Sequence, residues 1–218
     1  MRLSRFKISL FVYSTLLSCN VFANESVNLQ LRWHHQFQFA GYYAALEKGY
    51  YANAGLDVSI TEGSPEHDVL NEVLEQRAQY GVTNSDLLYK RLQGAPLVAL
   101  AAIFQHSPSV LLTHKTISRD RRIMMVEKKG DADFLAMFLN EGINKDSIIL
   151  QPMSFDLHDF ISGKTDAFHS YLTDQPYYLK QHGISYNIIN PRHYGVDFYG
   201  DILFTTEDEI KYHAERVK

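Results

Sequence analysis

The chain has little of several features that would assign it quickly to a functional class. Among 218 residues there is one cysteine, Cys19, so no disulfide can form within the chain. Lysine and arginine number 21 against 25 aspartate and glutamate, and the net charge of −4 without a basic run argues against nucleic-acid binding. No nucleophile elbow, phosphate loop or dinucleotide fingerprint occurs. A composition that is 45% hydrophobic and 21% charged instead indicates a globular protein with one large or two small cores.

A long apolar run is also missing, but a short one stands near the N-terminus. Basic residues precede the apolar segment 8–17, which is too short to cross a bilayer as a stable helix. We therefore expect residues 1–23 to be a signal peptide that is cleaved after Ala23, and the protein to be periplasmic. The alternative is a lipoprotein anchored through Cys19. Under the first interpretation the mature chain has no cysteine and no thiolate chemistry.

Strand-like and helix-like patterns alternate along the rest of the chain. We expect strands at 27–32, 56–61, 80–83, 97–104, 123–126, 148–151, 166–171, 186–189 and 201–205. We expect helices at 39–50, 64–74 (opened by Ser64 and Pro65), 86–92, 131–141, 156–162, 174–182 and after a capping box at Thr206. Such alternation predicts an α/β fold with mainly parallel sheets and helices on both faces.

The pattern starts again after residues 105–108, which predicts two lobes with a cleft between them. We expect a first lobe at 24–108, a second at 109–196 and a return to the first at 197–218. The chain stops inside the last expected helix, so we expect the first lobe to be incomplete.

The segment that follows the first strand is the most informative one. In an open α/β sheet, ligands sit beyond the carboxyl ends of the strands, and this loop contains the only tryptophan. Trp33 is a candidate to stack on a flat, nitrogen-rich ring, although a core position would also explain it. His35 or Gln36 is a candidate partner for a ring nitrogen, with a solvated loop as the alternative.

Two further candidate segments follow later strands of the first lobe. Asn84 and Ser85 lie between a strand and a helix, where they could contact a polar ligand, cap the helix, or do both. Gln105 lies at the first crossing between the lobes, where it would line the cleft or form part of a hinge turn.

The second lobe and the return segment supply the remaining candidates. Tyr171 is placed to form the opposite wall of a ring site, and Asp174 to accept a bond from an exocyclic amine or to cap a helix. Tyr199 and Asp201 mark the return to the first lobe, where a carboxylate would pair with a ligand amino group. We expect no metal site, because the histidines show no ligand spacing.

These segments resemble the thiamine-pyrimidine-precursor-binding and thiamine pyrimidine synthase family. The resemblance spans 27–218 and depends on 33–58 together with 81–85; runs like 36–45, 104–108 and 197–206 are typical of family members. It implies a two-lobed, type II periplasmic binding protein fold that binds a pyrimidine-like molecule. It also implies a membrane permease of an ABC transporter as partner, or a signalling domain of diguanylate cyclase or histidine kinase type.

The synthase branch of this family is an enzyme, and the chain departs from it. The family's cysteine-rich motif and its histidine are both missing from the corresponding segments, 194–201 and 84–88. We therefore expect a solute-binding protein without catalytic residues or cofactor, acting as a monomer. Family members also continue beyond the length of this chain.

Overall fold

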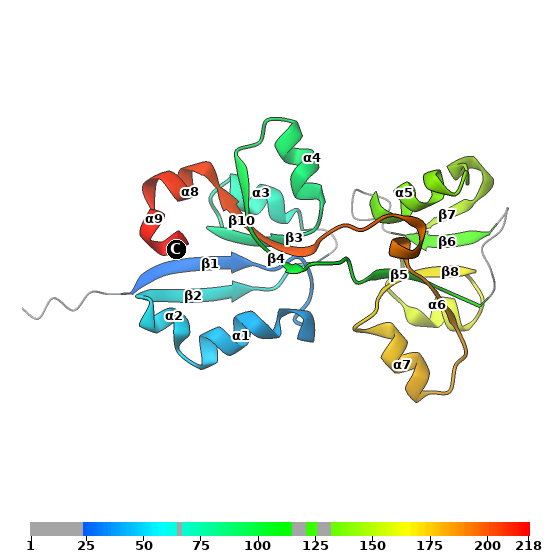
Figure 1. Ribbon diagram of the computed structural model, residues 1–218. Helices are drawn as coiled ribbons and strands as arrows, with labels where there is room; N and C mark the ends of the chain where they lie inside the picture. The colour runs from blue at the N-terminus through cyan, green and yellow to red at the C-terminus, as the bar shows by residue number, and fades with distance from the viewer. Residues whose placement is uncertain (1–23, 65–66, 115–120, 126–131) are drawn as a thin grey trace, which may run out of the picture.

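The computed structural model describes residues 24–64, 67–114, 121–125 and 132–218. The predicted signal peptide, with its cleavage after Ala23 or its alternative at Cys19, lies outside these ranges. Within them the chain forms two five-stranded sheets, each with its own helices, and we call each sheet with its helices a lobe (Figure 1). None of the helices in these ranges is both long and apolar enough to cross a membrane.

The first lobe contains a sheet with the strand order β2-β1-β3-β10-β4. Its strands are β1 (Glu25–Gln30), β2 (Leu56–Thr61), β3 (Tyr80–Thr83), β4 (Leu97–Phe104) and β10 (Gly200–Thr206). β1 runs parallel to β2 and β3, since helical segments connect these strands. β10 arrives from the second lobe and is antiparallel to both of its neighbours, β3 and β4.

The second lobe repeats this arrangement with the strand order β7-β6-β8-β5-β9. Its strands are β5 (Ser109–Thr113), β6 (Arg122–Met125), β7 (Ile149–Pro152), β8 (Ala167–Tyr171) and β9 (Asn187–Ile189). β6 is parallel to β7 and β8, whereas β5 is antiparallel to β8 and β9. The described part of each sheet thus has two parallel and two antiparallel pairings. The expectation of mainly parallel sheets is wrong on this point, because β5 and β10 enter from the opposite lobe.

β5 is the one described strand that the sequence patterns did not predict. Its five residues are all buried, and it lies between β8 and β9. Leu111 packs into the core on one face of the sheet, whereas Val110 and Leu112 pack into the core on the other. Because both faces are covered, the strand lacks the polar alternation that marks a half-exposed strand.

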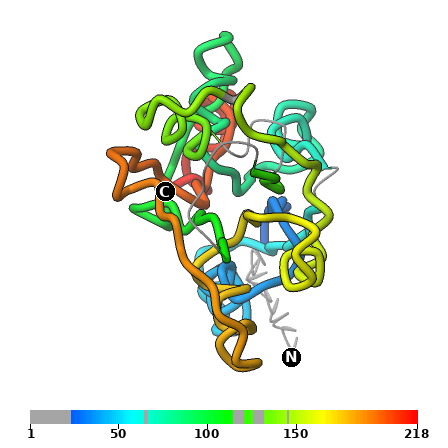
Figure 2. The backbone as a smooth tube through the Cα atoms, turned by 90° about the vertical axis from the view of Figure 1, so that its right-hand side faces the viewer, coloured from blue at the N-terminus to red at the C-terminus, as the bar shows by residue number. Residues whose placement is uncertain are grey.

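Helices cover both faces of each sheet, as predicted. They are α1 (Ala40–Glu47), α2 (Tyr50–Asn53), α3 (Val69–Leu74), α4 (Asp86–Leu92), α5 (Ala132–Asn140), α6 (Leu157–Ile161), α7 (Gln175–Gln181), α8 (Glu207–Tyr212) and α9 (Ala214–Val217), with 3-10 turns at Phe37–Phe39, Lys145–Ser147 and Pro191–Tyr194. Seen end-on, α4 lies at the top and α7 at the bottom (Figure 2). Four buried clusters, one on each face of each sheet, form the core.

Helix capping explains where two of these helices begin. α3 begins at Val69, because the carboxylate of Asp68 accepts a hydrogen bond from the Asn71 amide at 3.3 Å. The expected cap at Ser64 is therefore wrong, and Pro65 lies outside the described residues. At α8 the Thr206 hydroxyl does accept from the Glu209 amide, at 3.1 Å, as predicted.

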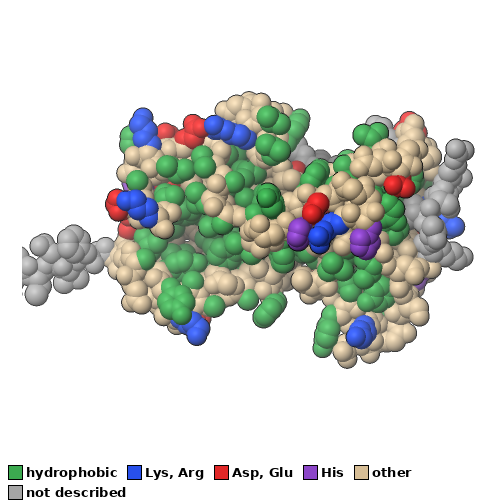
Figure 3. Space-filling view, viewed as in Figure 1, with side chains coloured by type: hydrophobic (Ala, Val, Ile, Leu, Met, Phe, Trp, Pro, Cys, Tyr) green, Lys and Arg blue, Asp and Glu red, His purple; other side chains and the backbone are tan. Residues whose placement is uncertain are grey.

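Two crossing segments connect the lobes, one from β4 to β5 and one from β9 to β10 (Figure 1). They run side by side, since the Ser107 amide donates to the Phe198 carbonyl at 2.7 Å. The Asp197 carboxylate forms an ion pair with Arg192 and lies within hydrogen-bond distance of His106 Nδ1, at 2.9 Å. Figure 3 shows charged and histidine side chains gathered over this middle part of the face. A pair of hydrogen-bonded connections of this kind can bend together, which makes it a natural hinge.

Candidate functional site

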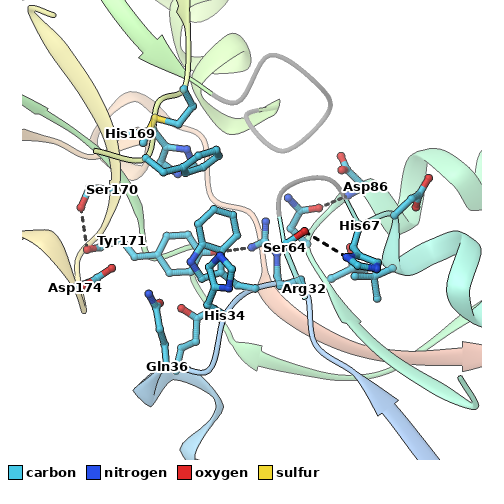
Figure 4. A pocket seen from close by; sticks show the side chains of 18 of the residues that line it. Arg32, His34, Gln36, Ser64, His67, Asp86, His169, Ser170, Tyr171 and Asp174 are labelled. Atoms are coloured by element: carbon cyan, nitrogen blue, oxygen red, sulfur yellow. Dashed lines mark hydrogen bonds between the residues drawn. The ribbon is translucent and has the colours of Figure 1, made fainter. Parts of the chain in front are cut away.

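A cavity of about 1370 Å³ lies between the lobes, at the carboxyl ends of their strands (Figure 4). The first lobe contributes Arg32, Trp33, His34, Gln36, Gln38, Ser64, His67, Asp68, Val69, Leu70, Thr83, Asn84, Asp86 and Lys90. The second lobe contributes Met153, Phe155, Phe168, His169, Ser170, Tyr171, Asp174 and Gln175. The carboxyl ends of strands are where α/β sheets bind ligands, and here two sheets present those ends to one space.

The Arg32 guanidinium forms the centre of a partly buried network that joins the lobes. Arg32 Nη1 donates to the Tyr171 hydroxyl and lies 3.5 Å from Asp201 Oδ1, while Gln38 Nε2 donates to Asp201 Oδ2 at 3.2 Å. Asp201 is 1% exposed, and burial raises its pKa, a rise that Arg32 opposes. Burial alone would lower the pKa of Arg32, but Tyr171 and Asp201 raise it above its usual value. Arg32 therefore stays charged and the network stabilises the contact between the lobes.

Aromatic rings from both lobes meet next to this network. The rings of Trp33 and Phe155 lie 4.9 Å apart between centroids and are tilted by 56°. Met153, Phe168 and Tyr171 continue the apolar lining on the side of the second lobe. Phe155 has φ = 59°, in the left-handed region that residues other than glycine seldom adopt, and its ring is 41% exposed. Strain of this kind is often found at ligand sites, and an exposed ring pair can accept a flat ligand.

Asp174 adds a carboxylate to the second-lobe wall. It precedes α7 but makes no capping bond through its side chain. Its carboxylate instead accepts from Gln175 Nε2 at 2.7 Å and hydrogen-bonds with the Gln36 side chain of the first lobe. Burial raises the pKa of Asp174, although these two bonds oppose the rise. The group can therefore accept a hydrogen bond from a ligand amine.

The side of the cavity farther from Tyr171 is polar (Figure 4). The Ser64 hydroxyl and His67 Nδ1 are 3.3 Å apart, and Asn84 Oδ1 accepts from the Asp86 amide at 3.1 Å. Lys90 supplies an ammonium group to this side. Across the ranges that the structure describes, no group of three or more His, Cys, Asp or Glu side chains is arranged to hold a metal ion.

Five of the ten residues that the sequence suggested as ligand contacts line this cavity. They are Trp33, Gln36, Asn84, Tyr171 and Asp174. All five follow or end a strand, and this position brings them together although Trp33 and Asp174 are far apart in the sequence. Their role as ligand contacts stays a prediction.

The other candidates do not line the cavity, and local contacts explain why. His35 is exposed, with its amide donating to Glu62 Oε1 at 2.8 Å and its ring bonded to Tyr43. Ser85 makes no capping bond, because Asn84 takes that role.

The candidates in the crossing segments and in the return strand also do not line the cavity. Gln105 turns back to donate to the Ala102 carbonyl at 2.6 Å, and Tyr199 is 56% exposed. Asp201 lies behind Arg32, so its carboxylate pairs with that guanidinium instead of facing the cavity.

Sequence reasoning missed two residues that shape the site. Arg32 follows the first strand, and an isolated arginine in that place is usually solvated; only its buried partner Asp201, 169 positions later, gives it a role. Phe155 stands in a short connection between a strand and a helix, where no pattern predicts either a left-handed backbone or contact with Trp33.

Comparisons with known proteins identify the family. The family model described as NMT1/THI5 like matches residues 36–218. The chain belongs to the NMT1/THI5-like family. The match begins at Gln36, in the loop after β1, and includes every second-lobe residue of the cavity.

Curated relatives of this NMT1/THI5-like chain include two binding proteins with named ligands. A riboflavin-binding protein from Chloroflexus aurantiacus is 23% identical in an alignment of 183 positions, which covers 76% of this chain and 51% of the relative. A formylaminopyrimidine-binding protein from Halalkalibacterium halodurans is 24% identical in an alignment of 208 positions, which covers 85% of this chain and 60% of the relative. The chain thus spans 51% and 60% of the lengths of these two relatives.

Solved structures confirm the type II periplasmic binding protein fold. A protein from Bordetella bronchiseptica RB50 has a TM-score of 0.66 at 16% identity, over 85% of this chain and 65% of that one. The periplasmic aliphatic sulphonate-binding protein SsuA from Escherichia coli has a TM-score of 0.60 at 14% identity, over 86% and 63%. At these identities the likeness concerns the fold alone.

Proposed function

We propose that this chain is the binding part of an exported solute-binding protein, which takes a pyrimidine-like heterocycle into the cavity and presents it to an ABC-type permease. One observation carries the proposal: Trp33 from the first lobe and Phe155 and Tyr171 from the second line the same cavity. Relatives whose names include formylaminopyrimidine and riboflavin support a ligand with a flat, nitrogen-containing ring.

Each part of the site has a role in this proposal. The Trp33 and Phe155 rings contact each other and together offer one aromatic surface for the heterocycle, since aromatic contacts contribute about 0.5–1.5 kcal/mol beyond the area that they bury. Gln36 and Asn84 offer amide groups to ring nitrogens, and Asp174 accepts a bond from an exocyclic amine. No catalytic step is assigned, because segments 194–201 and 84–88 lack the cysteine-rich motif and the histidine of the synthase branch.

The binding mechanism is closure about the two crossing segments. A ligand that contacts Trp33 and Asp174 at the same time binds the closed form, in which the lobes are close together, better than the open form. It therefore shifts the population toward the closed form. The permease would recognise that form. The interlobe contacts at Arg32 and Gln36 keep the two lobes in register while the remainder of the cavity opens and closes.

Calorimetry of the purified protein with 4-amino-5-hydroxymethyl-2-methylpyrimidine and with its formylamino counterpart tests the proposal. We expect at least one of them to bind, and Trp33→Ala to weaken that binding by about tenfold, a loss of about 1.4 kcal/mol. The control is Tyr177→Ala, which removes an aromatic ring that is 69% exposed on α7, outside the cavity. Absence of binding by both compounds, or equal losses in the two variants, would contradict the proposal.

A further inference from the structure

The size of the cavity does not match a single ring. Small-molecule sites commonly have volumes of about 300–1,000 Å³, and this cavity has about 1370 Å³. A pyrimidine packed against the Trp33 and Phe155 rings would fill only the aromatic side of this space. The rest of the cavity extends toward the ends of β2 and β3 in the first lobe, where polar side chains join Val69 and Leu70 in its lining.

The polar side is built from two parts of the first lobe. Ser64 and His67 come from the segment between β2 and α3, and Asp86 and Lys90 come from α4. Figure 4 shows Ser64, His67 and Asp86 on the side of the cavity away from Ser170, Tyr171 and Asp174. The hydrogen bond between Ser64 and His67 Nδ1, 3.3 Å long, orients the imidazole. A ligand reaching from Trp33 to these groups needs a part beyond its ring.

The charges on the polar side indicate the chemistry of that part. Two carboxylates, Asp68 and Asp86, and one ammonium, Lys90, line this side, while the Arg32 guanidinium is already paired with Asp201. A phosphate or sulfonate would be repelled by the carboxylates. Hydroxyl groups fit, because each can donate to a carboxylate and accept from Lys90 or Ser64.

We propose that the ligand is a flat nitrogen heterocycle that carries an uncharged polyhydroxyl chain, and that Ser64, His67, Asp86 and Lys90 bind this chain. The inference rests on the proposed function, since it places the ring against Trp33 and Phe155. It adds a second subsite, which distinguishes a ring with a hydroxylated chain from the same ring without one.

Three flavins that share one ring system form a matched set of probes: lumiflavin has no chain, riboflavin has a ribityl chain, and FMN has a phosphate at the end of that chain. Binding to the full chain is followed by quenching of flavin fluorescence. We expect riboflavin to bind at least tenfold more tightly than lumiflavin and at least tenfold more tightly than FMN. Lys90→Met and His67→Ala should each weaken riboflavin binding at least fivefold and leave lumiflavin binding unchanged.

The controls separate this inference from the proposed function. Lys180→Met removes an ammonium group on α7, outside the cavity, and should change neither affinity. Equal affinities for lumiflavin and riboflavin overturn the polyhydroxyl subsite and leave the ring site standing. Tighter binding of FMN than riboflavin overturns the choice of an uncharged chain. Binding of the hydroxymethylpyrimidine without binding of any flavin overturns the inference alone, whereas no binding of any compound overturns both proposals.

Discussion

Gly63 offers a sharp test of how the site is held in place. It follows β2 and packs against the loop that begins after β1, with its amide donating to the Trp33 carbonyl at 3.1 Å. A Cβ atom at this position would stand 2.2 Å from the Leu31 carbonyl oxygen and 2.8 Å from the Trp33 amide nitrogen. Real Cβ atoms essentially never approach closer than 3.0 Å, and both neighbours are backbone atoms. Gly63→Ala must therefore displace the loop that carries Arg32.

We expect this displacement to lower the free energy of unfolding by about 2–3 kcal/mol, toward the upper end for overpacking, because backbone yields less easily than side chains. Urea denaturation measures that loss. The contact between Arg32 and Tyr171 also depends on the loop, so ligand affinity should fall in the same variant.

Gly41→Ala is the matched control. Gly41 lies in α1, and a Cβ atom there would meet nothing within 4 Å. Alanine favours a helix over glycine, so this variant should gain up to about 1 kcal/mol of unfolding free energy. If Gly63→Ala stays within about 0.5 kcal/mol of the unmodified protein, less than the cost of even mild overpacking, the loop is not held as we infer.

Two further predictions concern charges. Arg32→Met should lower the unfolding free energy by about 3–5 kcal/mol in urea denaturation, because it leaves the buried Asp201 carboxylate without its cation. The double variant that also carries Asp201→Asn should recover part of this loss. A double variant less stable than Arg32→Met alone would refute the pairing. Hydrogen bonds from Arg122, at 2.9–3.1 Å, lower the pKa of Asp166, so its contribution is present at neutral pH and is lost as the pH falls through that lowered value. Asp166→Asn should therefore cost about 1 kcal/mol at pH 7, and the deficit should shrink as the pH falls below the ordinary range of an aspartate; a deficit of unchanged size in acid would contradict this reasoning.

Much of the local structure could be predicted from the sequence. The expected strands at 56–61, 80–83 and 97–104 and the helix at 86–92 match β2, β3, β4 and α4 residue for residue. Their periodicity and their flanking glycines carry enough local information for this. β5 failed because both of its faces are buried by the fold, so its five residues show no period at all.

The residues of the candidate site could also be predicted only in part from the sequence. Trp33, Gln36, Asn84, Tyr171 and Asp174 could be named because each stands at the end of a recognisable strand, where α/β proteins place ligands. His35, Ser85, Gln105 and Tyr199 stand in similar sequence positions, but their side chains turn to nearby partners or to solvent. Sequence position indicates the edge of the sheet, but it does not say which way a side chain points.

The sequence by itself determined the order of strands and helices, the two-part organisation and the family resemblance, because these depend on periodicity, caps and short motifs. Only the tertiary structure decided that Arg32 binds Tyr171 and Asp201, that Phe155 faces Trp33, and that one side of the cavity is polar. These contacts join residues more than 100 positions apart. Which of them meet is decided by how the strands pair and how the lobes close, and no local pattern records that.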